Sequence, residues 1–118
     1  MEVFPMVYRC AVAIKPKQPF LDWLNKIESP ADETLSELQQ DCNLYLVPDY
    51  EDEEDMEKAI EKYIKSNYSG IFINELAAWY LDETMYPKLT YATFLEWFEI
   101  TMHTMIFDMV NEPLDKED

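Results

Sequence analysis

The 118-residue chain contains a single glycine, Gly70. Loops that cradle phosphate groups need several glycines at fixed spacing, so neither the dinucleotide-binding pattern nor the P-loop pattern can be written in this sequence. Tight turns have to rely on proline, asparagine and aspartate instead. The shortage of glycine therefore excludes these nucleotide-binding motifs.

Histidine and cysteine are also scarce, with only His103, Cys10 and Cys42 present. The two cysteines form neither a CxxC pattern nor a metal-ligand spacing, so we predict reduced thiols, no metal site and no cofactor. The N-terminus lacks a charged segment followed by an apolar run, and no stretch reaches the length of a membrane span. These absences predict a cytoplasmic protein that does not contact a membrane.

Basic residues are few, with 9 Lys and Arg against 25 Asp and Glu, which leaves a net charge of −16. Such a charge repels the phosphates of nucleic acids and anionic lipids, so we expect no direct nucleic-acid binding. It favours a protein partner with a basic surface. Solubility alone is the simpler explanation of the charge.

Apolar residues make up 48% of the chain, including three Trp, eight Tyr and six Phe. This is enough material for one well-filled core, and the length is typical of one domain. We therefore expect a single domain over residues 1–118, with a short polar tail at 111–118.

Strands and helices are expected from the spacing of the apolar residues. Residues 7–14 and 44–47 have the composition of strands, and 7–14 is apolar on both faces, which is typical of a strand covered on both sides. The sequence Ser-Asn-Tyr-Ser-Gly at 66–70 is expected to interrupt a long helical region. The expected helices are residues 19–27, a segment capped by Ser29, residues 51–65, residues 71–83 and a short segment capped by Thr90.

Residues 98–110 fit both a strand and a continued helix, and their β-branched and aromatic content favours the strand. With this third strand, the order of elements predicts an α+β fold: a small sheet of about three strands covered by helices.

His103 lies within this stretch, near Glu99 and Asp108. A carboxylate beside a histidine can orient it for base chemistry, which leaves an enzyme using His103 as a hypothesis. No nucleophile is placed next to it by spacing, and one histidine with scattered carboxylates is a weak metal pattern. A structural histidine at the sheet margin is the favoured interpretation.

Six of the seven residues at 51–57 are acidic. The glycine of a calcium-binding EF-hand loop is missing there, and a solvated helix start explains the acids without a ligand. The sharper alternative is a DNA mimic, in which rows of carboxylates occupy the basic groove of a nucleic-acid-binding protein and inhibit it.

Aromatic and acidic residues occur together between 75 and 99. Glu75, Trp79, Asp82 and Glu83 would share one face of a helix, and Trp97 follows in the next helical segment. Aromatic rings beside carboxylates suit a cation such as a lysine, arginine or amine. Core packing of the rings, with the acids outside, is the more common arrangement.

The sequence also resembles a family of small, acidic bacterial proteins that have no assigned activity. The similarity is carried by Pro-Phe-Leu-Asp-Trp at 19–23, Tyr-Leu-Val-Pro at 45–48, Glu-Leu-x-x-Trp at 75–79 and Trp-Phe followed by His103. It implies a soluble bacterial domain and transfers no catalytic residue, and it places His103 with the two tryptophans in one pattern.

These observations predict a non-enzymatic binding module for a basic protein partner. Its expected contact surface consists of Trp79, Asp82, Glu83, Trp97 and His103. The alternatives are the DNA-mimic inhibitor and, less favoured, an enzyme using His103.

Overall fold

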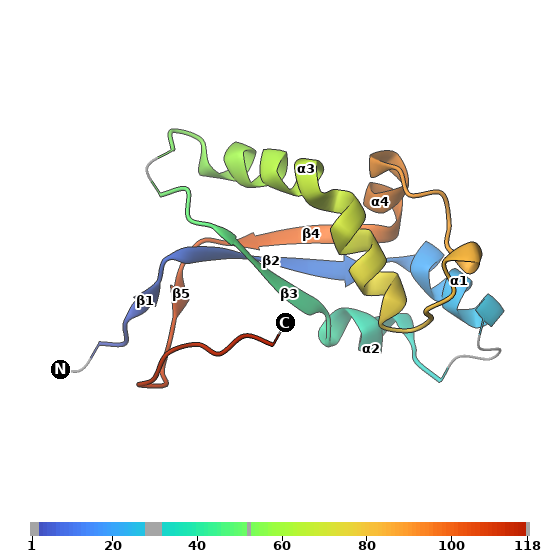
Figure 1. Cartoon of the computed structure of the whole chain (residues 1–118), viewed down its shortest axis with the longest axis horizontal. Helices are drawn as coiled ribbons and strands as arrows, with labels where there is room; N and C mark the ends of the chain where they lie inside the picture. Colours follow the sequence, from blue (N-terminus) through green and yellow to red (C-terminus); the bar gives the residue numbers. More distant parts are fainter. Residues whose placement is uncertain (1–2, 28–31, 52, 118) are drawn as a thin grey trace.

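The longest strand, β2 (Arg9–Pro16), lies at the centre of a three-stranded antiparallel sheet (Figure 1). The computed structural model describes residues 3–27, 32–51 and 53–117. Strand β3 (Asn43–Pro48) pairs with one edge of β2, and β4 (Phe98–His103) pairs with the other. All three expected strands are confirmed, as is the α+β class, because residues 98–103 form a strand and not a helix.

A second, two-stranded antiparallel sheet extends from one end of the first. It pairs β1 (Met6–Val7) with β5 (Ile106–Phe107), and Figure 1 shows it projecting beyond the helices. We call residues 3–8 and 104–108 the arm. The sequence pattern did not predict it, since each strand has only two residues.

In the described ranges, four α-helices and a 3₁₀ turn complete the fold, and α3 is the longest of them (Figure 1). Side chains cap three of these helices: Thr34, Asp55 and Thr90 accept hydrogen bonds from the backbone N–H groups of the first turn. The bounds are α1 (Gln18–Ile27), α2 (Leu35–Gln40), α3 (Met56–Ala77), η1 (Glu83–Met85) and α4 (Tyr91–Trp97).

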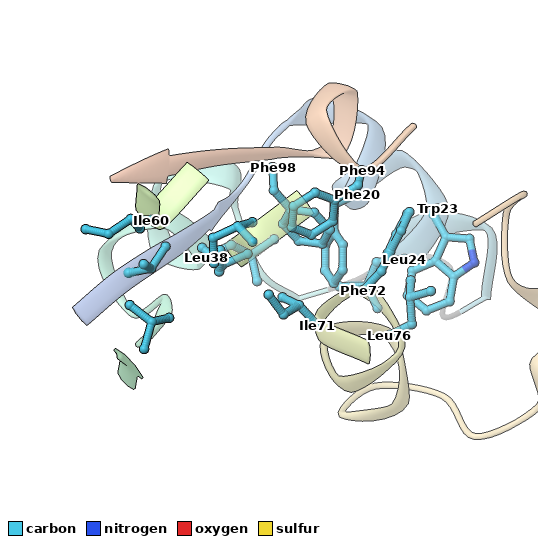
Figure 2. Close-up of a cluster of buried hydrophobic side chains, with 14 of the residues drawn as sticks. Phe20, Trp23, Leu24, Leu38, Ile60, Ile71, Phe72, Leu76, Phe94 and Phe98 are labelled. Carbon is cyan, nitrogen blue, oxygen red and sulfur yellow. The ribbon is translucent and has the colours of Figure 1, made fainter. Parts of the chain in front are cut away.

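The core lies between the sheet and the helices and is dominated by phenylalanine (Figure 2). Phe20 of α1, Phe72 of α3, and Phe94 and Phe98 around the α4–β4 junction are almost fully buried. The ring centroids of Phe20 and Phe72 each lie 5.5 Å from that of Phe98. This cluster ties three helices to strand β4.

Helix α3 runs without interruption through residues 66–70, so the expected break is wrong. The polar residues of this segment are satisfied within the helix: Ser66 Oγ donates to the Lys62 carbonyl and Asn67 Nδ2 to the Tyr63 carbonyl. Buried Ile64 and Ile71 on either side anchor the helix to the core. Tertiary packing therefore overrides the poor local propensity, which is a weak term.

The second expected helix begins later than its sequence pattern suggested. The Ser29 cap lies outside the described residues, and α2 starts at Leu35 after the Thr34 cap. Thr34 Oγ1 accepts from the backbone N–H of Glu37 and donates to its side chain, so the cap lies five residues downstream of the expected Ser29 cap.

Coverage differs between the strands of the sheet. Cys10, Val12 and Ile14 of β2 are buried in the core beneath the helices. On the opposite face of β3, Leu44 and Leu46 are 66% and 51% exposed, so that face is not covered along this strand. The expected burial of β2 on both sides is confirmed, because Ala11 and Ala13 on its second face are also buried.

Both cysteines carry free thiols, as predicted, with Cys10 buried and Cys42 half-buried. Within the described residues, none of the helices has the length and apolar character needed to cross a membrane.

Candidate functional site

The expected helical face with Trp79, Asp82 and Glu83 does not form. Helix α3 ends at Ala77, and Trp79 lies in the turn that follows, where its backbone N–H donates to the Leu76 carbonyl at 3.0 Å. Asp82 caps η1 and accepts hydrogen bonds from the Thr84 side chain at 2.6 Å and its backbone N–H at 3.0 Å. These bonds lower the pKa of Asp82.

Trp97 belongs to the aromatic packing of the core. Its ring centroid lies 5.7 Å from that of Phe72 and 6.2 Å from those of Phe20 and Trp23. These contacts are those of a residue packed in the core, which was the alternative to a place on a binding surface. The rings that contact Trp97 come from α1 and α3, and Trp79 is not one of them.

His103 is exposed at the end of β4, on the sheet face that the helices leave open, opposite Ala11. It is the last of the six residues of β4, and Trp97 directly precedes the first, which corresponds to about 20 Å along a strand. The fold thus does not bring together the five residues expected to form one surface.

Trp79 instead lies between two adjoining cavities of about 270 and 440 Å³. Leu38 and Asp41 also line both. The first cavity is closed by Glu75 and the start of β3, and the second by Glu33 and Glu37 beside α2. We call this region, defined by Glu33, Glu37, Asp41, Glu75 and Trp79, the Trp79 hollow.

Glu75 is the one charged side chain among the described residues that is buried, with 4% of its surface exposed. It projects from the last turns of α3 toward β3. Its Oε2 accepts a hydrogen bond from Asn43 Nδ2 at 2.8 Å and another from the Tyr45 hydroxyl. Asn74 Nδ2 in turn donates to the Tyr45 oxygen at 2.8 Å. These partners fix the carboxylate in place.

The second oxygen of Glu75, Oε1, accepts no hydrogen bond from the described residues. Both hydrogen bonds go to Oε2, and the described residues include no buried polar side-chain atom without a partner, so Oε1 is not sealed from solvent. Burial and the bond to Glu75 raise the pKa of Tyr45. Tyr45 therefore stays protonated and donates to the carboxylate.

The walls of the hollow carry one sign of charge. The described residues that line the two cavities include four acids and no Lys, Arg or His. Four carboxylates around one indole attract a cation, and the low exposure of Glu75 reduces the screening of its charge by solvent. The arrangement can bind a positively charged group and offers no nucleophile–base pair at hydrogen-bonding distance.

Sequence reasoning identified only part of this site. The Glu-Leu-x-x-Trp motif contains both Glu75 and Trp79, but the helical pattern placed Asp82 and Glu83 beside them. Glu33, Glu37 and Asp41 looked like ordinary surface acids of a helix with few apolar residues. Only the packing of α2 beside the end of α3 brings these three acids to the tryptophan.

The acidic run at 51–57 forms the approach to α3, with Asp52 outside the described residues. The Asp55 side chain caps the helix by accepting a hydrogen bond from the Lys58 backbone N–H. Lys58, Lys62 and Lys65 line the same surface cavity of about 790 Å³ as Glu53 and Glu54, so the acids there are interleaved with bases. In the described part of the chain, no group of three or more His, Cys, Asp or Glu side chains is arranged to hold a metal ion.

Comparisons with protein-family models, with curated proteins and with solved structures found no match, so the resemblance to small acidic bacterial proteins stays a prediction.

Proposed function

We propose that the protein is a non-enzymatic binding module that takes a basic segment of another protein, with one lysine or arginine side chain in the Trp79 hollow. The observation that carries the proposal is the buried Glu75 carboxylate beside Trp79, in cavities whose charged walls are all acidic. The proposed partner is a basic protein, as the net charge suggested. Of the contact residues expected from the sequence, only Trp79 belongs to the hollow.

The size of the inner cavity favours a single side chain. Its volume of about 270 Å³ lies just below the range of roughly 300–1,000 Å³ typical of small-molecule sites. The aliphatic stem of a lysine or arginine would pack against Trp79 and Leu38, and its charged end would face the carboxylates. Arginine has the further advantage that its planar group can bond Oε1 of Glu75 and a second acid together.

The two alternatives lack a supporting observation of this kind. A DNA mimic needs a continuous row of carboxylates, whereas lysines alternate with the acids at the start of α3. An enzyme using His103 needs a cavity beside that residue, and His103 lines none of the four cavities described.

The proposal is tested with two variants that lose the same charge. Glu37→Gln with Asp41→Asn removes two carboxylates from the hollow, and Glu53→Gln with Glu54→Gln removes two from the acidic run. All four side chains are exposed, so both variants should fold. The probe is a short capped peptide with a central arginine, and a citrulline peptide of the same shape serves as the uncharged control.

Binding is followed by the NMR shift of the Trp79 indole N–H, assigned with Trp79→Phe. The hollow variant should bind the arginine peptide at least about tenfold more weakly, a free-energy change of about 1.4 kcal/mol, and the acidic-run variant should bind like the wild type. Equal weakening in both variants would show that only the net charge of the protein attracts the peptide, which contradicts the proposal. A larger loss in the acidic-run variant would favour the DNA mimic.

The protein partner is then sought by affinity capture from a bacterial lysate at low and moderate salt. A basic protein that survives moderate salt on the wild type and the acidic-run variant, but not on the hollow variant, supports the proposal. Many basic proteins that all wash off at moderate salt, irrespective of the variant, contradict it.

A further inference from the structure

The face of the sheet opposite the helices is apolar and open. The register places Ala11 between Leu46 and His103, and Ala13 between Leu44 and Thr101. The alanines are shielded by these neighbours, but Leu44 and Leu46 are 66% and 51% exposed. Large apolar side chains next to each other on one face are uncommon on a monomer and mark interaction sites.

The arm projects beyond the end of the sheet and carries further exposed apolar side chains (Figure 1). Tyr8, Met105 and Phe107 are 70%, 66% and 53% exposed, and Phe4 near the N-terminus is 48% exposed. A two-stranded ribbon is marginally stable in water unless it packs against something. In the described part of the chain, Phe4, Tyr8, Met105 and Phe107 of the arm are exposed and do not belong to the set packed against the hydrophobic core.

The amount of exposed surface is larger than a compact monomer needs. The chain exposes 8629 Å², whereas a compact monomer of 14.1 kDa exposes about 6,700 Å². The excess of about 1,900 Å² includes the extended C-terminal residues, but it is more than twice the area of about 800 Å² that each partner contributes to an ordinary stable interface. The long dimension of 52 Å, against 30 and 27 Å, reflects the projecting arm.

Charge argues for a second copy of the chain as the occupant. The five strands contain one acidic residue, Glu99, although the chain has 25. The open face and the arm together carry Arg9 and Lys15 against Glu99 and Asp108, so this side is close to neutral in a protein of net charge −16. Two such chains repel each other through their acidic helical sides, and the repulsion is weaker when they approach through this nearly neutral side.

We propose that the protein forms a symmetric dimer through this sheet-and-arm surface, with the arm of each copy packed on Leu44 and Leu46 of the other. A two-fold arrangement uses the same patch on both copies and closes after two chains. The Trp79 hollow is built on the helical side, so each dimer would present two hollows to a partner.

The mass in solution is the test, measured by sedimentation equilibrium over about 1–100 μM, a range that suits an interface of this size. The wild type should reach twice 14.1 kDa. Leu44→Glu with Leu46→Glu should stay at the mass of one chain, and Leu81→Glu with Leu95→Glu, two exposed leucines elsewhere, should dimerise like the wild type. Circular dichroism confirms that each variant is folded.

A wild type that keeps the mass of one chain throughout overturns the proposal, whatever the variants do. A dimer that survives Leu44→Glu with Leu46→Glu overturns this choice of surface. The dependence on salt concentration distinguishes the two proposals. The dimer should become tighter as salt screens the repulsion between two acidic chains, whereas binding of an arginine peptide in the hollow should become weaker. The variant Glu37→Gln with Asp41→Asn should dimerise normally, so failure of one proposal leaves the other intact.

Discussion

Replacing Gly70 by alanine should stabilise the protein, because the glycine lies on the exposed side of the unbroken helix α3. A Cβ atom added at this position meets nothing within 4 Å, and the backbone is not in the left-handed region that glycine favours. The substitution therefore adds no clash and no strain. It removes conformational freedom from the unfolded chain and so favours the folded state.

The expected gain in the free energy of unfolding is about 0.5–1 kcal/mol, the difference between glycine and alanine inside a helix. For a domain of this length it corresponds to a rise in melting temperature of about 3–5 °C. The assay is urea and thermal unfolding followed by circular dichroism at 222 nm. Ser69→Gly, at the neighbouring exposed position, is the matched control and should lower stability by about 0.5 kcal/mol.

The opposite pair of results would refute the reasoning. If residues 66–70 formed a break that requires glycine, Gly70→Ala would lower the melting temperature and Ser69→Gly would leave it unchanged. The experiment thus decides directly between the interrupted helix expected from the sequence and the continuous helix of the structure.

Further predictions concern the core, a helix cap and the buried network. Phe72→Ala should lower the free energy of unfolding by about 3–5 kcal/mol, because Phe72 is fully buried among other rings; a loss below 1 kcal/mol in urea unfolding would contradict this packing. Thr90→Ala should cost about 1 kcal/mol, since Thr90 Oγ1 caps α4 through the Thr93 N–H, and Thr90→Ser should recover most of it. Because the folded-state pKa of Tyr45 is raised, its contribution to stability is complete below about pH 10 and is lost as the pH rises further. Wild-type stability should therefore fall more steeply above pH 10 than that of Tyr45→Phe, and parallel curves would show that Tyr45 is not held by Glu75.

Local patterns in the sequence determined much of the fold. The β-rich stretches 7–14 and 44–47 became β2 and β3, the stripe of Phe20, Trp23 and Leu24 became the buried side of α1, and Thr90 capped α4 as expected. These signals are short-range: alternation, helical spacing and capping act within a few residues, so they can be read before the chain is folded.

Only the tertiary structure decided the site and the continuity of α3. Glu33, Glu37 and Asp41 meet Trp79 because α2 packs beside the end of α3, a relation that no spacing in the sequence encodes. Gly70 stays helical because Ile64 and Ile71 are buried on either side of it. Composition set the charge and the core material of this protein, whereas long-range packing selected which few of its 25 acids surround an aromatic ring. The physical reason is that burial and the proximity of charges depend on distances in space, which exist only after the helices have packed on the sheet.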